Sequence, residues 1–195
     1  MKSPTHLRVI LASNSPRRHA LLREIVPNFE IAPPRDIDES YPKTMDVLEV
    51  ASFLSQVKAN GYADLVDADT VLITADTVVV VDDKILGKPR STEQAFEMLK
   101  QLSGRMHKVI TGVTLMSAAK KVTFSHITEV YFDEIPEEQL RQYIEEFKPF
   151  DKAGSYGIQE WIGCRGIKGM KGCFYNVMGL PVNDLYNHLE SFSRT

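Results

Sequence analysis

The residues best suited to chemistry near the start of the chain are Ser13-Asn14-Ser15-Pro16-Arg17-Arg18. The apolar run over residues 7–12 predicts a short buried strand before them, and helical spacing from Leu21 predicts a helix after them. Ser15 suits the N-cap and Pro16 suits the first helical position. Backbone N–H groups, hydroxyls and two guanidinium groups therefore gather at a corner that favours an anion, above all phosphate. A capped surface helix with two solvated arginines explains this segment alone equally well.

A second candidate is the carboxylate of Asp76, which stands between the β-branched runs of residues 71–74 and 78–81. A charged group among apolar residues must be partnered or useful. One interpretation is a turn aspartate that accepts backbone hydrogen bonds. The other is a general base or a metal-bound carboxylate.

Three basic residues in other segments add to this set. Lys88 and Arg90 lie in a loop around Pro89, where they are either solvated or neutralise phosphate charge. Lys58 falls near the end of a predicted helix, where it suits the helix dipole as readily as a ligand. Each of these signals is weak by itself.

Apolar periodicity and turn residues predict the elements that position these groups. Helical spacing predicts a helix over residues 47–57, just before Lys58. Further predicted elements are a hairpin turn at Asp82-Asp83, a helix from a capping box at Ser91 and Gln94 to Ser103-Gly104, a hairpin of residues 108–116 and 122–132, and helices from Pro136 and Pro181. Seven glycines between Gly154 and Gly179 predict tight turns around Asp151-Lys152 and Gln159. Strands mixed with helices predict an α/β fold with a mixed, twisted sheet.

Composition narrows the class of protein. A chain of 195 residues suits one domain with a sizeable core. A net charge of -3 without a basic stripe argues against a nucleic-acid partner and favours a small anionic ligand. No apolar stretch reaches the length of a membrane span, and the first residues lack the apolar segment of a signal peptide, so we expect no membrane partner and a cytoplasmic location. We expect Cys164 and Cys173 to be reduced thiols, and the five histidines show no metal-ligand spacing.

In order and spacing, these segments together resemble the Maf family of nucleoside triphosphate pyrophosphatases. The resemblance covers nearly the whole chain, so residues 1–195 are expected to form a single Maf-like domain. Its motifs are Ala12 to Arg18 with Leu21-Leu22, Asp38-Glu39-Ser40, Lys58-Ala59, Ala75-Asp76-Thr77-Val78-Val79, Gly87-Lys88-Pro89, Ser103-Gly104, His107, Val109, Thr111-Gly112-Val113, Asp151-Lys152-Ala153-Gly154, Tyr156-Gly157-Ile158-Gln159, Asn176-Val177 and Gly179-Leu180-Pro181.

The resemblance implies an elongated α/β domain with a central mixed twisted sheet flanked by helices, like the fold of inosine triphosphate pyrophosphatases. It implies a nucleotide bound in a cleft between two lobes, and a homodimer. The implied reaction is hydrolysis of dTTP and UTP to the monophosphate and pyrophosphate. This reaction would serve as house-cleaning of the nucleotide pool. The implied cofactor is a divalent cation, Mg²⁺ or Mn²⁺, since Mg²⁺ binds through few carboxylates plus substrate phosphates.

The resemblance also implies roles for individual residues. Asp76 is the implied catalytic base, and whether it holds a proton or the metal together with Glu39 stays open. The residues implied to line the triphosphate site are Ser13, Arg17, Arg18, Glu39, Lys58 and Lys88. Those implied to select the nucleobase are Arg17, Thr77 and Gln159, which match the branch that acts on dTTP and UTP.

The chain departs from the family pattern at two places. Gly172-Cys173-Phe174 replaces the usual Gly-Ser-Tyr, and Glu160-Trp161 follows Gln159 where small residues are common. The rival hypothesis is a nucleotide-binding regulator of cell division or septum formation without significant turnover, which has no need of a base at Asp76. A phosphotransferase is disfavoured because no P-loop sequence is present.

Overall fold

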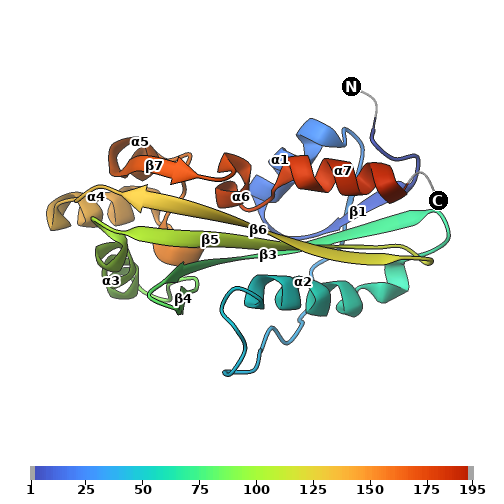
Figure 1. The fold of residues 1–195 in the computed structure, drawn as a ribbon, viewed down its shortest axis with the longest axis horizontal. Helices are drawn as coiled ribbons and strands as arrows, with labels where there is room; N and C mark the ends of the chain where they lie inside the picture. The colour runs from blue at the N-terminus through green and yellow to red at the C-terminus, as the bar shows by residue number, and fades with distance from the viewer. Residues whose placement is uncertain (1–2, 193–195) are drawn as a thin grey trace. The chain divides into compact units, whose positions relative to one another are not determined.

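The computed structural model describes residues 3–192 as a mixed β-sheet flanked by helices (Figure 1). The strands are β1 (Arg8–Ala12), β2 (Glu30–Ile31), β3 (Thr70–Val81), β4 (Lys84–Leu86), β5 (Met106–Met116), β6 (Lys121–Phe132) and β7 (Ile167–Lys171). Their order is β2-β1-β3-β5-β6-β7, with β4 paired to β3. β1 is parallel to β2 and β3, whereas β4 and β7 are antiparallel to their neighbours. The predicted α/β class with a mixed sheet is confirmed.

The helices are α1 (Pro16–Ile25), α2 (Val50–Gly61), α3 (Thr92–Leu102), α4 (Glu137–Phe147), α5 (Trp161–Gly166), α6 (Phe174–Met178) and α7 (Val182–Phe192), with 3-10 turns at Ala63–Leu65 and Ala153–Ser155. The predicted caps are confirmed, because Ser15 accepts a hydrogen bond from the backbone N–H of Arg18 and Ser91 accepts one from that of Gln94. The second helix begins at Val50, three residues later than its apolar periodicity predicts. No helix within residues 3–192 combines the length and apolarity needed to cross a membrane.

Contacts divide the chain into two compact units. The first holds the described residues up to Asp76, Thr111–His126 and those from Gly179 onward, and the second holds Thr77–Ile110 and Ile127–Met178. In the first unit, Ile10 and Leu72 pack with Tyr62, and α2 lies on one side of the sheet while α1 and α7 lie on the other (Figure 1). In the second, the core includes Phe96 of α3, Tyr143 of α4 and neighbours from the sheet.

β3 differs from its prediction. The two β-branched runs are not separate strands, because one strand of 12 residues passes through Asp76 without a break. Asp76 is therefore no turn residue, and that interpretation is wrong. The turn comes six residues later, at Asp82 and Asp83, whose positive φ angles of 49° and 55° suit a tight hairpin.

The glycine-rich segment holds more regular structure than its turns predict. It contains α5, β7 and α6, which lack the length for a periodic signal. Gly163 in α5 is required by a close approach, since a Cβ there would lie 1.8 Å from the carbonyl oxygen of Ile158. Cys164 and Cys173 are both free thiols, as expected.

Candidate active site

The side chain of Asp76 lies on the face of β3 that packs against α2. Side chains two apart on β3 point the same way, and residues three apart on α2 share one face. The hydroxyl of Thr74 donates to the carbonyl of Ser55 at 2.7 Å. Two residues further along the strand, Asp76 Oδ1 lies 2.5 Å from Nζ of Lys58, three residues after Ser55.

Lys58 binds a second carboxylate. Its Nζ lies 3.2 Å from Glu39 Oε2, in the acidic loop before α2. The side chains of Lys58 and Asp76 are only 16% and 13% exposed, whereas that of Glu39 is 50% exposed. One ammonium thus compensates a largely buried carboxylate and a more accessible one.

Arg18 completes the charged cluster from the side of α1. Its Nε donates to the carbonyl of Gly179 and its Nη1 to that of Ala75, both at 2.8 Å. Burial lowers the pKa of Arg18, whereas the charges of Asp76 and Glu39 oppose this effect and that of Arg17 adds to it. Arg18 is therefore a fixed cation within electrostatic reach of Asp76.

The corner between β1 and α1 is built as its residues predict. The backbone N–H of Ser15 donates to Ser13 Oγ at 3.2 Å, and the carbonyl of Ser13 lies 2.6 Å from His19 Nε2. Pro16 occupies the start of α1, where helices leave backbone N–H groups without a helical partner. The predicted capped helix start is confirmed, and it lies in the same unit as Asp76. That it binds an anion stays a prediction.

The structure brings five of the predicted residues within contact or electrostatic reach of one another, namely Arg17, Arg18, Glu39, Lys58 and Asp76. Ser13 belongs to the same unit. The other three, Thr77, Lys88 and Gln159, belong to the second unit. Thr77 follows Asp76 on β3, so strand alternation directs its side chain to the opposite face. Its role in base selection stays a prediction.

Lys88 and Gln159 are both exposed in the second unit. The loop of Lys88 is joined to the Asp151–Gly154 motif, because the N–H of Gly154 donates to the carbonyl of Gly87 at 3.1 Å. Gln159 lies in the turn before α5. Their contact with a nucleotide stays a prediction.

Residues that sequence reasoning did not assign to the site gather beside Gln159. Lys152 Nζ lies 3.0 Å from Glu160 Oε1, and the hydroxyl of Tyr143 donates to the other oxygen of Glu160. The Asp151-Lys152 motif and the unusual Glu160 were the available signals. The other departure from the family pattern changes less, since Cys173 binds Thr128 Oγ1 through its backbone N–H and Phe174 is exposed.

His107 is buried rather than catalytic. Its Nε2 lies 2.7 Å from the hydroxyl of Tyr156, and its Nδ1 is buried with no hydrogen-bond partner among the described residues. Burial lowers the pKa of His107 to about 3. The imidazole is therefore neutral at physiological pH, and it packs edge-on against Phe132.

Glu39 and Asp76 are the carboxylates available for a metal ion. Residues 3–192 contain no cluster of three or more His, Cys, Asp or Glu side chains able to hold one. Two carboxylates that already share one cation nevertheless fit Mg²⁺, which binds proteins through one or two carboxylates and takes its other ligands from substrate phosphates and water.

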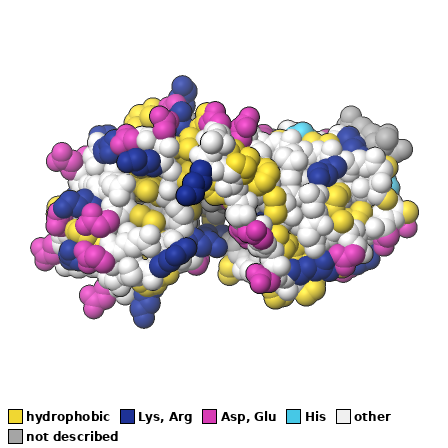
Figure 2. Space-filling model, turned by 90° about the horizontal axis from the view of Figure 1, so that it is seen from below, with side chains coloured by type: hydrophobic (Ala, Val, Ile, Leu, Met, Phe, Trp, Pro, Cys, Tyr) yellow, Lys and Arg dark blue, Asp and Glu magenta, His cyan; other side chains and the backbone are white. Residues whose placement is uncertain are grey.

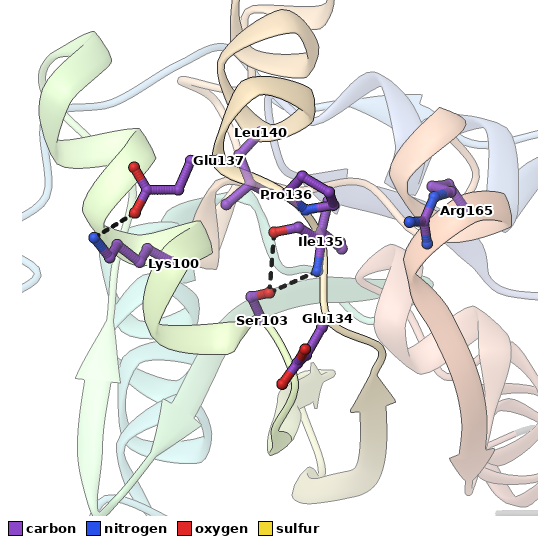
Figure 3. A pocket seen from close by; sticks show the side chains of 8 residues that line it. All are labelled: Lys100, Ser103, Glu134, Ile135, Pro136, Glu137, Leu140 and Arg165. Carbon is purple, nitrogen blue, oxygen red and sulfur yellow. Dashed lines mark hydrogen bonds and ion pairs between the residues drawn. The ribbon is translucent and has the colours of Figure 1, made fainter.

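The surface carries two further features that bear on ligands. A cavity of about 500 Å³ in the second unit contains none of the predicted site residues (Figure 3). Lys100 and Glu137 on its wall pair at 2.6 Å, and the hydroxyl of Ser103 accepts a hydrogen bond from the N–H of Ile135. On the face drawn in Figure 2, basic side chains of the described residues are interspersed with acidic ones and form no continuous stripe.

Comparison with known proteins identifies the family. A sequence profile described as Maf-like protein matches residues 8–192. A dTTP/UTP pyrophosphatase of Parabacteroides distasonis is 46% identical over 185 residues, covering 95% of this chain and 96% of that protein. One from Cytophaga hutchinsonii is 48% identical over 183 residues, covering 93% and 83%. The Ham1 protein of Staphylococcus aureus, a solved structure, aligns with a TM-score of 0.46 and 15% identity over 64% of this chain and 71% of that one. The chain belongs to the Maf-like protein family.

Proposed function

We propose that this protein is a nucleoside triphosphate pyrophosphatase that hydrolyses dTTP and UTP to the monophosphate and pyrophosphate. The observation that carries this proposal is the cluster of Asp76, Lys58 and Arg18, in which a largely buried carboxylate pairs with one cation and lies within electrostatic reach of a second. The relatives from Parabacteroides distasonis and Cytophaga hutchinsonii, both named dTTP/UTP pyrophosphatase, support the choice of substrate.

Asp76 is the general base of the proposed mechanism. It accepts a proton from the water that attacks the α-phosphorus, which contributes about 10²–10⁴-fold to the rate. Its position on a central strand and its pairing with Lys58 fix the carboxylate, so little reorganisation is needed at the moment of reaction.

Lys58, Arg18 and Lys88 neutralise the charge of the triphosphate. The ammonium of Lys58 has three donors, so it can bind a phosphate oxygen while it keeps its contacts with Asp76 and Glu39. Arg18 is held by two backbone carbonyls and supplies a fixed charge. Ser13 and Arg17, at the start of α1, bind phosphate oxygens there.

A divalent cation, Mg²⁺ or Mn²⁺, completes the proposed site. Glu39 would hold it, with Asp76 as the second ligand in the alternative in which Asp76 does not act as base, and when bound the cation would neutralise charge on the phosphate oxygens. Arg17, Thr77 and Gln159 select the base. We further propose a homodimer that acts on small-molecule nucleotides in the cytoplasm, where it removes dTTP and UTP from the pool.

The competing hypothesis is a nucleotide-binding regulator without turnover. Incubating the chain with dTTP, UTP, CTP, ATP, GTP and 7-methyl-GTP in Mg²⁺, and then identifying the products by chromatography, separates the two. We expect monophosphate and pyrophosphate from dTTP and UTP. Tight binding without products would favour the regulator, and early accumulation of diphosphate would exclude the proposed reaction.

A further inference from the structure

The turn that carries Gln159 is fixed at both ends. The N–H of Glu160 donates to the carbonyl of Gly157 at 3.0 Å, which closes the turn. The carbonyl of Glu160 then accepts a hydrogen bond from the N–H of Gly163 at 2.9 Å, which starts α5. Gln159 is the exposed residue between these anchored positions.

A buried, charged brace holds this turn in place. Glu160 uses both carboxylate oxygens, one with Lys152 and one as acceptor for the hydroxyl of Tyr143. The same hydroxyl accepts a hydrogen bond from the N–H of Gly157 at 3.1 Å. The side chains of Lys152 and Glu160 are only 10% and 15% exposed. One carboxylate therefore ties together both ends of the turn around Gln159.

The phenol of Tyr143 stays a hydrogen-bond donor over the whole physiological range. Burial raises the pKa of Tyr143, and the adjacent charge of Glu160 raises it further. The protonated phenol and the ammonium of Lys152 together compensate the carboxylate of Glu160, as a largely buried charge requires. The carboxylate of Glu160 thus has two donors beside Gln159.

A glutamine by itself is a poor reader of pyrimidines. Uracil and thymine share an imide N–H flanked by carbonyls, whereas cytosine has an acceptor nitrogen and an amino group at the corresponding positions. A half turn of the carboxamide exchanges its donor and acceptor, so a freely rotating Gln159 would match either pattern. Selection requires a group that fixes the orientation of the amide.

Glu160 is placed to do this. A Cβ at Gly157 would lie 2.8 Å from Glu160 Oε1 and 3.0 Å from Gln159 Nε2. The carboxylate and the amide nitrogen therefore lie against the same side of Gly157, where only a glycine leaves room for both. The negative charge attracts the NH₂ end of the amide and repels its carbonyl end.

We propose that Glu160, held by Lys152 and Tyr143, is a positioning residue that orients the carboxamide of Gln159 for selection of uracil and thymine over cytosine. The carbonyl of Gln159 then faces away from Glu160 and accepts a hydrogen bond from the imide N–H. This inference rests on the proposed function, in which Gln159 contacts the base.

The first test is Glu160→Gln, which keeps the size of the side chain and removes its charge. The ratio of kcat/KM for UTP to that for CTP should fall about tenfold, the effect of one misdirected hydrogen bond. The fall should come through KM for UTP, with kcat within about threefold of wild type. Both values come from one preparation, so a change in the folded fraction cancels from the ratio.

Tyr143→Phe removes the donor to Glu160 and should lower the same ratio. Its matched control is Tyr131→Phe, because the hydroxyl of Tyr131 also donates to a carboxylate, that of Glu129, at 2.7 Å, but both residues are on β6 and not on the turn. The control should keep the wild-type ratio. If Glu160→Gln fails to fold, Tyr143→Phe decides.

Trp161 gives a readout that does not depend on turnover. It is the only tryptophan in the chain, and its ring lies 6.5 Å from that of Tyr143 with an interplanar angle of 27°. Titration with UMP and with CMP, followed by Trp161 fluorescence, should show a preference for UMP that Glu160→Gln reduces by the same factor.

The outcomes separate this inference from the function on which it rests. If Gln159→Ala lowers the ratio while Glu160→Gln and Tyr143→Phe both leave it unchanged, Glu160 does not orient the amide and the inference is wrong. If the wild-type chain hydrolyses neither dTTP nor UTP, the proposed function itself fails.

Discussion

The ammonium of Lys58 lies 2.5 Å from the carboxylate of Asp76, and both side chains are largely buried. This pair explains how a strand of apolar and β-branched residues tolerates a carboxylate at its centre. It also links the stability of the first unit to the residue proposed as base, because loss of either partner leaves the other charge with weaker compensation.

Lys58→Met should therefore lower the free energy of unfolding by about 1–3 kcal/mol, less than for a fully buried pair because both groups keep some contact with water. In an Asp76→Asn background the same substitution should cost at least about 1 kcal/mol less. Urea unfolding of the four proteins measures this coupling. Lys100→Met, which removes the exposed pair with Glu137, is the control and should change stability little. Equal costs of Lys58→Met in both backgrounds would contradict the pairing.

Asp76→Asn should nearly abolish turnover of UTP while preserving fold and size. The amide keeps the shape of the side chain and cannot accept the proton, so kcat should fall about 10²–10⁴-fold. The control is Asp69→Asn, an exposed carboxylate just before β3. Near wild-type turnover in Asp76→Asn would exclude Asp76 as base, and circular dichroism shows whether the fold is retained.

His107 should make the protein less stable in mild acid. Its pKa is about 3 in the folded protein and about 6.5 in the unfolded chain, so the unfolded chain binds the proton first. The stability that depends on a neutral imidazole at His107 is therefore complete above about pH 6.5. It is lost as the pH falls toward 3, by at most about 1.4 kcal/mol per pH unit.

Urea unfolding at several pH values between 7.5 and 4.5 measures this slope. His107→Phe should flatten it, because a phenyl ring has no proton to bind. His6→Gln, which changes an exposed histidine, should keep the wild-type slope. An unchanged slope in His107→Phe would show that other groups determine the acid sensitivity.

Gly163→Ala should destabilise the protein, although alanine favours helices over glycine by about 1 kcal/mol. The added Cβ would lie 1.8 Å from the carbonyl oxygen of Ile158, so α5 must move away from the Gln159 turn. We expect a loss of about 1–3 kcal/mol, typical of overpacking. Gly87→Ala is the control, since no atom lies within 4 Å of its Cβ position. Stabilisation by Gly163→Ala would mean that helix propensity outweighs the close contact.

Local chemistry made much of the fold predictable. Ser15 and Pro16 start α1 through bonds within four residues, and Asp82-Asp83 forms the turn its sequence indicates. The continuity of β3 through Asp76 was not predictable, because the partner that stabilises the carboxylate is Lys58, 18 positions earlier in the chain.

The candidate site was also predictable only where it depends on local sequence. The capped start of α1 is visible in one stretch of sequence, and the resemblance to the Maf family supplied Asp76, Lys58 and Gln159 as candidate site residues. The brace around Gln159 was not predictable, because Tyr143 is a core residue of α4 whose hydroxyl meets Glu160 only in the folded chain. The periodicity that predicts Tyr143 in the core does not reveal that its hydroxyl has a hydrogen-bond partner.

The position of attack can be read from isotope incorporation. If Asp76 activates water against the α-phosphorus, the new P–O bond forms on the monophosphate, and pyrophosphate leaves with its own oxygens. The proposed contacts of Arg18 and Lys58 with the triphosphate suit this course because cations on the β- and γ-phosphates stabilise the charge that develops on the leaving group. A single turnover of UTP in H₂¹⁸O should therefore place one ¹⁸O in UMP and none in pyrophosphate, as measured by mass spectrometry.

Attack at the β-phosphorus would place the label in pyrophosphate instead, and the roles of the base and of the cations on the leaving group would then have to be reassigned. Asp76→Asn should slow the incorporation without changing its position, because the geometry of the bound triphosphate depends on the cations and not on the base.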